Sequence, residues 1–317
     1  MNVLVVVDHV DAAPRASALE LLTAARELGD VHAVWFGAGA EAAAPILGAY
    51  GAAVLHTFDL ADDAAQPASL AAALAPLATD VDAAVVLLAS TFVGKEVAAR
   101  VALALDAGLV VDVTGVAVED GRVTATQQAF AATWALRGAV LRDRAVVTVK
   151  SNAVRALPVD APGVPEVRPR GAVAVADPRV RVVERTSRAA SGRPDVGEAS
   201  IVVVGGRGTG GDFGPVNELA DALGAAVGAT RDATDEGWIE HEAMVGQTGS
   251  SIAPRLYVGA GVSGAVHHRG GMQASGTIVA VNSDPDSPIF EIADFGVVGD
   301  LFEVLPQAAE EVRRRKA

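Results

Sequence analysis

Two glycine-rich segments in the last third of the chain carry side chains suited to binding a large polar ligand. The first is Val245-Gly246-Gln247-Thr248-Gly249-Ser250, and the second runs from Val258 through Gly261-Val262-Ser263-Gly264-Ala265-Val266-His267-His268. Glycine lets a backbone approach a ligand closely, while amide, hydroxyl and imidazole groups supply hydrogen bonds. This combination predicts a site for a nucleotide-containing cofactor.

A third glycine-rich segment follows a predicted strand and fits the pattern G-x-G-x-x-G at Gly206, Gly208 and Gly211. In dinucleotide-binding folds such glycines form a tight turn beside the pyrophosphate. An NAD site would also place an acidic residue about 20 residues further on to bind the ribose. This chain offers Thr230 and Arg231 there. NADP binding, in which an arginine accommodates the 2′-phosphate, and a glycine-rich turn without a ligand are both open alternatives.

Two arginines stand just after neighbouring predicted strands, Arg207 after Ile201–Val204 and Arg231 after Ala225–Ala229. Open α/β sheets bind ligands at the carboxyl ends of their strands. A guanidinium at that edge can neutralise a phosphate, or can lie beside a flavin ring that becomes negatively charged on reduction. A surface ion pair is the alternative for each arginine.

His267 and His268 are adjacent, so on a helix their side chains point about 100° apart and at most one is expected to serve a given ligand. No further His, Asp or Glu stands at the spacing of a recurrent metal-site motif, so no metal site is predicted. Neither a nucleophile nor an acid–base pair stands out, and we therefore predict no catalytic residue. An ordinary turn role is the alternative for the polar loop residues, Gln247, Thr248, Ser263 and Asn282.

The composition narrows the class of protein and its partners. The net charge of −14 argues against nucleic acid as a partner, because phosphate backbones bind clustered lysine and arginine. The chain has no cysteine, which excludes disulfides and thiolate catalysis and leaves redox chemistry to an organic cofactor. Its first residues lack the basic region of a signal peptide, and their apolar run is far too short to span a bilayer. We therefore expect a cytoplasmic protein with no stable membrane insertion.

The first half of the chain alternates short β-branched runs with alanine-rich segments, which is typical of a parallel sheet covered by helices on both faces. The predicted strands are Val3–Asp8, His32–Phe36, Ala53–Thr57 and Ala84–Ala89, and the predicted helices are Ala16–Leu28, Ala40–Tyr50, Leu70–Leu77 and Lys95–Leu105. After Gly108, strand-like runs joined by polar turns such as Asp120-Gly121 predict an antiparallel extension of the same sheet. These runs are Val110–Glu119, Arg122–Phe130, Leu136–Leu141 and Ala145–Lys150.

A polar, aperiodic stretch predicts a domain boundary. We expect residues 187–199 to link an N-terminal domain, residues 1–186, to a C-terminal domain, residues 200–317. The second domain repeats the alternation, with predicted strands at Ile201–Val204, Ala225–Ala229, Leu256–Val258, Thr277–Val281 and Val297–Gly299. The predicted fold class is therefore α/β, with two domains that are each a mainly parallel sheet flanked by helices.

The order and density of the motifs in the last third resemble those of the α subunit of the electron-transfer flavoproteins. The segments that carry this resemblance are Val202–Gly208, Gly246–Gly249, Gly261–His268, Gly271-Met272, Thr277–Asn282, Asp284-Pro285, Pro288–Phe290 and Ala293–Phe302. Thr91–Glu96 and Asp112–Gly115 extend it, more loosely, into the first half. The resemblance thus covers nearly the whole chain.

This resemblance implies an FAD-binding C-terminal domain and an N-terminal domain that docks a β subunit to form a heterodimer. It implies an electron carrier, and not a catalyst with its own substrate, that accepts electrons from flavin-dependent dehydrogenases and passes them to a membrane quinone reductase or another acceptor. The residues alone leave two alternatives. One is an NAD(P)-dependent oxidoreductase that uses Gly206, Gly208 and Gly211, and the other is an interaction subunit without a cofactor.

The resemblance also implies individual roles. Arg231, with Thr230 beside it, matches the family's flavin arginine, and Arg207 matches its phosphate-side arginine. Gln247 and Thr248 would face the N5 and O4 edge of the flavin. The expected FAD-binding residues are Arg207, Thr230, Arg231, Val245, Gly246, Gln247, Thr248, Ser263, Gly264, Ala265, Val266, His267, His268, Asn282, Asp300 and Leu301.

Within that set, the loop Ser263–His268 would hold the N1–O2 edge and the pyrophosphate, with His268 as the family's imidazole. Asn282 and Asp300 would meet the adenosine end. Two positions depart from the family pattern, because His267 stands where glutamine is expected in many members and Ser250 where lysine is frequent.

Overall fold

The structure is a computed structural model that describes residues 1–316 except 131, 178, 181 and 185–191. The chain divides into two compact units, one formed by residues 1–128 and 135–187 and the other by residues 129–134 and 188–317. The predicted linker, residues 187–199, begins outside the described residues, which resume at Gly192. Within the described part of the chain, no helix is long and apolar enough to cross a membrane.

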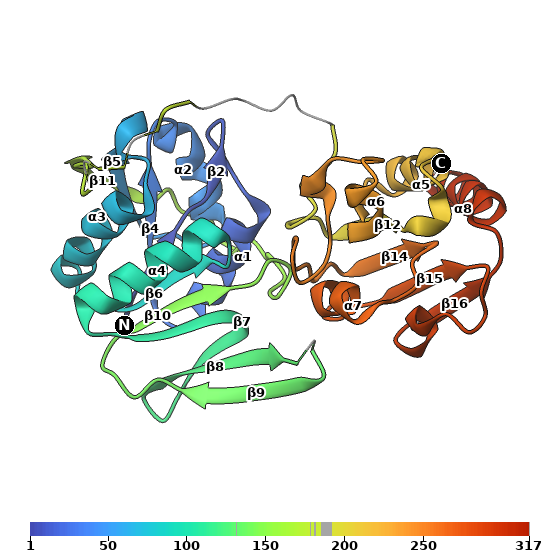
Figure 1. Cartoon of the computed structure of the whole chain (residues 1–317). Helices are drawn as coiled ribbons and strands as arrows, with labels where there is room; N and C mark the ends of the chain where they lie inside the picture. The colour runs from blue at the N-terminus through green and yellow to red at the C-terminus, as the bar shows by residue number, and fades with distance from the viewer. Residues whose placement is uncertain (131, 178, 181, 185–191, 317) are drawn as a thin grey trace. The chain divides into compact units, whose positions relative to one another are not determined.

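The first unit is built on a nine-stranded sheet with the order β11-β5-β4-β1-β6-β10-β7-β8-β9 (Figure 1). Neighbouring strands from β11 to β7 are parallel, and β8 pairs with β7 in antiparallel register. The strands of this unit are β1 (Asn2–Val6), β2 (His9–Val10), β3 (Ala13–Pro14), β4 (Asp30–Phe36), β5 (Val54–Asp59), β6 (Ala83–Ala89), β7 (Gly108–Glu119), β8 (Arg122–Ala129), β9 (Trp134–Ala139), β10 (Ala145–Val149) and β11 (Glu166–Ala172). Its helices are α1 (Ala16–Arg26), α2 (Ala40–Ala49), α3 (Pro67–Asp80) and α4 (Phe92–Leu105).

Helices cover the sheet of this unit on both faces, as its apolar strands predict. Successive residues of a strand point to opposite faces, so Val3 of β1 packs with Leu22 of α1, whereas Leu4 packs with Leu74 of α3 and Val97 of α4. All of these side chains are buried, and each contributes about 1.5–3 kcal/mol through removal from water. The result is a doubly wound core that places the carboxyl ends of β1, β6 and β10 at one edge.

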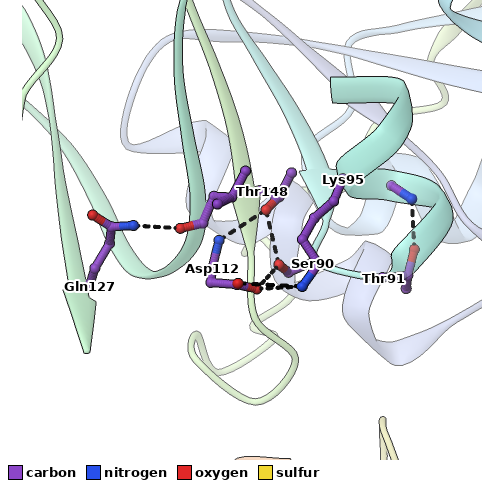
Figure 2. Close-up of polar contacts among 8 residues, drawn as sticks. Ser90, Thr91, Lys95, Asp112, Gln127 and Thr148 are labelled. Carbon is purple, nitrogen blue, oxygen red and sulfur yellow. Dashed lines mark hydrogen bonds and ion pairs between the residues drawn. The ribbon is translucent and has the colours of Figure 1, made fainter. Parts of the chain in front are cut away.

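A β-bulge marks the point where β7 leaves the parallel sheet for its antiparallel partner. Val111 and Asp112 of β7 together face Thr148 of β10, and Asp112 adopts a left-handed conformation with φ of 57°. The carbonyl of Val111 accepts a hydrogen bond from Gln127 Nε2 of β8 at 2.6 Å (Figure 2). The bulge therefore bends β7, and the Val111 carbonyl at the bulge bonds a side chain of the antiparallel strand β8.

A closed set of polar contacts holds this bulge (Figure 2). Thr148 Oγ1 accepts from the Asp112 amide at 3.0 Å and donates to Ser90 Oγ at 2.9 Å, because the Ser90 proton goes to Asp112 Oδ1 at 2.5 Å. Lys95 Nζ of α4 adds contacts of 3.1 and 3.3 Å to the same carboxylate. Burial opposes ionisation of Asp112, but the bonds from Ser90 and Lys95 outweigh it and lower the pKa of the carboxyl. The two N-terminal segments of the resemblance, Thr91–Glu96 and Asp112–Gly115, thus meet in one network.

Two features of the first unit differ from the sequence prediction. The run Ala145–Lys150 was expected in the antiparallel extension, but β10 lies between β6 and β7 and is parallel to both. Its residues are buried on both faces, which is typical of a central parallel strand. The sequence also did not predict β11, an exposed edge strand whose Pro169 and charged residues hide the strand pattern. The turn at Asp120-Gly121 is confirmed, since both residues have positive φ between β7 and β8.

The second unit is a smaller parallel sheet with the order β13-β12-β14-β15-β16 (Figure 1). Its strands are β12 (Ile201–Gly205), β13 (Ala226–Ala229), β14 (Leu256–Ala260), β15 (Ile278–Asn282) and β16 (Phe295–Val298), and its helices are α5 (Gly214–Leu223), α6 (Arg231–Asp235), α7 (Val266–Met272) and α8 (Leu301–Lys316). One face packs on α5 and α8, for example through Val203 and Leu305, and the other on α7 through Tyr257 and Met272. The predicted α/β class and the two mainly parallel sheets are confirmed.

The strand order of the second unit reverses at β12, because β13 lies on one side of it and β14 on the other. At such a switch point the connections leave in opposite directions and open a crevice at the carboxyl ends of the strands. The glycine-rich segments after β12 and β14 both begin at this edge. The fold therefore brings the sequence motifs to one place.

Candidate functional site

A cleft of about 920 Å³ lies at the carboxyl edge of the second unit's sheet. It is lined by residues that follow β12, β13, β14 and β15 and by the start of α8. The lining residues are Arg207, Gly208, Thr230, Arg231, Asp232, Asp235, Gly261, Val262, Ser263, Ala265, His267, His268, Val281, Asn282, Ser283, Asp284, Ser287, Gly299, Asp300, Leu301 and Phe302. Its size is within the range of small-molecule and cofactor sites.

The glycines after β12 and β14 let two loops touch, backbone against backbone, at the base of the cleft. The Gly208 amide donates to the Gly261 carbonyl at 3.0 Å. A Cβ on Gly206 would lie 2.3 Å from the Gly261 oxygen, and one on Gly208 would lie 2.7 Å from the Gly261 Cα. Helix α5 begins only at Gly214, after a short 3₁₀ turn at Arg207–Thr209. Loop contact accounts for Gly206 and Gly208 without any ligand, so the G-x-G-x-x-G match is no evidence for NAD(P).

Arg207 and Arg231 follow β12 and β13 and line the cleft, as the sequence predicts. Arg207 pairs with Asp232 at 2.7 Å and Arg231 with Asp235 at 3.1 Å, but the arginine side chains are 76% and 66% exposed. Ion pairs this exposed contribute little to stability. Both guanidiniums can therefore turn to an anionic ligand at small cost.

The loop of residues 245–250 is fastened to β13 and to α7. The Val245 amide donates to the Ala229 carbonyl at 2.9 Å, and the Gln247 amide donates to the His267 carbonyl at 3.0 Å. A Cβ on Gly271 would lie 2.4 Å from Gly246, so α7 approaches this loop too closely for any other residue. Gln247 also contacts the cleft indirectly, because its Oε1 lies 3.1 Å from His267 Nδ1.

His267 and His268 point in different directions, as their spacing on a helix predicts. His267 is exposed and lines the cleft. His268 is buried and has partners for both ring nitrogens, with Nδ1 2.9 Å from the Val245 carbonyl and Nε2 2.7 Å from the Tyr257 hydroxyl. Burial lowers the pKa of His268 to about 4, although the Val245 carbonyl acts in the opposite direction. The imidazole is therefore neutral near pH 7.

Asn282 and Asp300 form hydrogen bonds that hold the cleft loops after β14 and β15 and the start of α8. Asn282 Nδ2 donates to the Val262 carbonyl at 2.9 Å and to Ser287 Oγ at 3.1 Å, and Ser287 donates in turn to the Ser263 carbonyl. Asp300 Oδ1 accepts from the Phe302 amide at 2.9 Å, which caps the first turn of α8. Both side chains thus use part of their hydrogen-bonding capacity within the protein.

The structure brings most of the predicted site residues to one cleft. Those that line it are Arg207, Thr230, Arg231, Ser263, Ala265, His267, His268, Asn282, Asp300 and Leu301. The remaining predicted residues do not line it, and they are Val245, Gly246, Gln247, Thr248, Gly264 and Val266. Sequence reasoning missed Tyr257, whose strand position gave no sign of its bond to His268, and the lining residues Asp232, Asp235, Ser283, Asp284, Ser287 and Phe302.

The chain is similar to known proteins over almost its whole length. The family model of the electron transfer flavoprotein domain matches residues 3–178, and that of the electron transfer flavoprotein FAD-binding domain matches residues 195–273. The chain is 42% identical over 318 residues to the electron transfer flavoprotein subunit alpha of Mycobacterium leprae. The aligned region covers 99% of this chain and 98% of the relative. The Mycobacterium tuberculosis subunit (strain CDC 1551 / Oshkosh) is 43% identical over 320 residues, with 99% of each chain covered.

A eukaryotic relative is similar over the same length. The probable mitochondrial subunit alpha of Cryptococcus neoformans var. grubii is 38% identical over 324 residues, which cover 99% of this chain and 92% of the relative. The match to the FAD-binding domain starts before β12 and extends through α7, so it includes the ends of β12, β13 and β14 and the cleft loops that follow them. The chain therefore belongs to the electron transfer flavoprotein α-subunit family and carries that family's FAD-binding domain.

Proposed function

We propose that this chain is the FAD-carrying subunit of a heterodimeric electron carrier. In this proposal it pairs with a β subunit, receives electrons from flavin-dependent dehydrogenases and passes them to a quinone reductase or another acceptor. The observation that carries the proposal is the cleft at the switch point of the second unit, where two exposed guanidiniums face a wall of hydrogen-bonding loop residues. Such a site can bind and stabilise a cofactor that gains negative charge without a nucleophile or acid–base pair.

The residues of the cleft fit FAD. Arg207 and Arg231 supply positive charge for phosphates and for a reduced ring, while Ser263, His267 and Asn282 offer hydroxyl, imidazole and amide groups along the same cleft. The hydroxyl of Thr230 also fits a bound ligand, because its Oγ1 is buried and has no hydrogen-bond partner among the described residues. A buried hydroxyl without a partner is costly, and a ligand in the cleft would satisfy it.

The proposed residue roles assign each wall of the cleft to one part of FAD. Arg231 compensates the charge of the reduced ring, with Thr230 beside it, and Arg207 faces the phosphates. Gln247 and Thr248 are assigned to the N5 and O4 edge, although in this structure Gln247 reaches the cleft only through His267. FAD, when bound, supplies the reversible uptake of electrons, and these side chains orient it and set the charge around it.

The other wall is assigned to the N1–O2 edge, the pyrophosphate and the adenosine end. Ser263, Gly264, Ala265 and Val266 offer the backbone of the loop that leads into α7, and the first turn of a helix leaves amides free to donate. His268 contributes a neutral ring to this wall, since both of its nitrogens are bonded within the protein. Asn282, Asp300 and Leu301 are assigned to the adenosine end, with Val245 and Gly246 supporting the opposite loop.

The first unit is proposed to dock the β subunit. Its antiparallel extension supports this role, because Leu109, Leu136 and Leu141 are exposed on or beside β7 and β9. Exposed apolar side chains are typical of a protein interface where they form one patch. We also propose that the heterodimer works in the cytoplasm, without stable membrane insertion and without nucleic acid as a partner.

The domain boundaries are proposed at residues 1–186 and 200–317, with 187–199 as a linker. Limited trypsin digestion of the native complex is expected to cut first after Arg188 or Arg193 and to release two resistant fragments. Early cleavage inside Val202–Val281 would contradict this boundary.

An absorption spectrum of the chain copurified with its β partner tests the function directly. The complex should show the visible bands of oxidised flavin, and acid extraction should release FAD in proportion to this chain. Photoreduction should bleach the bands, and an electron acceptor should restore them. A colourless complex that takes up no added FAD would refute the proposal.

A further inference from the structure

A hydroxyl–imidazole pair lies beneath the cleft, on the side of the second sheet that packs against α7. Tyr257 of β14 is completely buried, and its hydroxyl lies 2.7 Å from Nε2 of His268. The other ring nitrogen, Nδ1, lies 2.9 Å from the Val245 carbonyl. Gly259 makes room for the phenol, because a Cβ there would lie 2.9 Å from both Cε1 and Oη of Tyr257.

These contacts define where the imidazole carries its proton. A carbonyl oxygen only accepts hydrogen bonds, so His268 Nδ1 carries a hydrogen and donates it to Val245. In the neutral ring Nε2 is then an acceptor, and the Tyr257 hydroxyl is its donor. Burial raises the pKa of Tyr257, which keeps the phenol protonated. The tautomer of His268 is therefore set by its two neighbours.

The bond to Val245 links this tautomer to the loop of residues 245–250. His268 belongs to α7 and lines the cleft, whereas Val245 begins the loop that also bonds α7 through Gln247. If Nε2 carried the proton instead, Nδ1 would become an acceptor facing a carbonyl oxygen, and this link would become repulsive. The Val245 carbonyl thus selects the Nδ1–H tautomer, and the Tyr257 hydroxyl supplies the donor that the buried Nε2 then needs.

We propose that Tyr257 is a positioning residue for the cofactor site, whose hydroxyl donates to Nε2 of His268 and so holds the ring whose Nδ1–H tethers residues 245–250 to α7. This inference rests on the proposed function in so far as the tethered loop borders FAD. It does not require His268 to bond the cofactor or to carry charge. The tautomer and the loop position are properties of this chain alone.

The test compares Tyr257→Phe, which removes only the hydroxyl, with Tyr50→Phe. Tyr50 is the chain's only other tyrosine and follows α2 in the first unit, so it is a matched control. Each full chain is copurified with its β partner and labelled with ¹⁵N-histidine, and a His268→Asn sample assigns the ring signals. Long-range ¹H–¹⁵N spectra then report the tautomer and the titration of His268 in protein stripped of FAD.

In the wild-type chain we expect a protonated Nδ1 and an unprotonated Nε2. In Tyr257→Phe the neutral ring loses a donor, so the titration midpoint of His268 should rise by up to about one pH unit. The charged side chains of the cleft wall, Arg207, Arg231, Asp232, Asp235, Asp284 and Asp300, are unchanged in both variants, so the shift reports the lost hydroxyl. A wild-type ring with a protonated Nε2, or an unshifted midpoint in Tyr257→Phe, would overturn the inference.

Amide hydrogen exchange of residues 245–250 and the FAD dissociation constant test the tether. The exchange rates of these amides and the FAD dissociation constant should each change by roughly two- to tenfold in Tyr257→Phe. Both quantities should stay at the wild-type value in Tyr50→Phe. Unchanged exchange and unchanged FAD affinity in Tyr257→Phe would overturn the positioning role. If the wild-type complex bound no FAD, the proposed function would fail, whereas the tautomer and exchange results would still decide the inference.

Discussion

Acidification from pH 7 to pH 5 should destabilise each unit of this protein through buried histidines, chiefly His56 in the first unit and His268 in the second. In the first unit, His56 is completely buried, with Nε2 3.1 Å from His32 Nδ1. Its Nδ1 accepts from Arg170 Nε at 3.1 Å, and Arg170 also binds Asp80 at 2.7 Å. Burial and the positive charge of Arg170 lower the pKa of His56 to about 4. In the second unit, burial lowers the pKa of His268 to about 4 as well.

The magnitude follows from the difference between the folded and unfolded pKa values. Each ring starts from an ordinary value of 6.5, so the unfolded chain binds more protons than the folded one as the pH falls below that value. Stability is therefore fully present above about pH 6.5 and is lost as the pH falls toward 4. Between pH 7 and pH 5, each histidine should remove about 2 kcal/mol from the free energy of unfolding of its unit. Carboxyls with lowered pKa, such as Asp112, titrate below this window.

Urea denaturation of the copurified complex at the two pH values measures this loss. His56→Asn should be less stable than wild type at pH 7, because Arg170 and His32 lose a partner, but it should lose about 2 kcal/mol less on acidification. His241→Asn, at an exposed position of the second unit, is the control and should keep the wild-type pH dependence. If His56→Asn lost as much stability between pH 7 and pH 5 as wild type, the explanation by His56 protonation would be wrong.

Two further pairs of substitutions test charged side chains, one pair in each unit. Arg231→Met should lower the reduction potential of bound FAD by about 40–90 mV, the equivalent of about 1–2 kcal/mol for one electron at a partly exposed site, whereas Arg207→Met should mainly weaken FAD binding. Redox titration and FAD dissociation constants separate the two, and an unchanged potential in flavin-loaded Arg231→Met would remove its charge-compensating role. Asp112→Asn should destabilise the first unit by about 1–2 kcal/mol, while Asp106→Asn, also at positive φ but in a surface ion pair, should change it by less than about 0.5 kcal/mol in urea denaturation. Equal losses in both variants would show that the Asp112 network adds nothing beyond a surface pair.

Local pattern predicted much of the fold because its parallel strands are short, apolar and separated by alanine-rich helices. β1, β4, β5 and β6 lie within one or two residues of the predicted positions. β10 was placed wrongly because strand order depends on long-range pairing, and the chain order puts it next to β9. β11 was not predicted because an exposed edge strand with Pro169 and several charges needs no apolar alternation.

Site residues could be predicted from the sequence where they directly follow a recognisable strand. Arg207 and Arg231 could be placed at one edge, because parallel strands all end there. The burial of His268 and its bond to Tyr257 were not predictable, since the two residues belong to different elements and local pattern carries no signal for a contact between them. The Ser90–Asp112 contact was hidden for the same reason, although both of its flanking segments belong to the resemblance.

The protonation state of His268 decides which groups can compensate charge in the cleft. A buried imidazole with a pKa of about 4 and two neutral partners contributes no positive charge near pH 7. The remaining cations of the lining are Arg207 and Arg231, whose guanidiniums stay charged at any physiological pH. Because both are exposed and paired with nearby aspartates, they can reorient toward a ligand without leaving a charge buried and unpaired. In the proposed function, binding and charge compensation in this cleft therefore depend on the arginines, while the buried histidine acts through the position of the loop to which it is bonded.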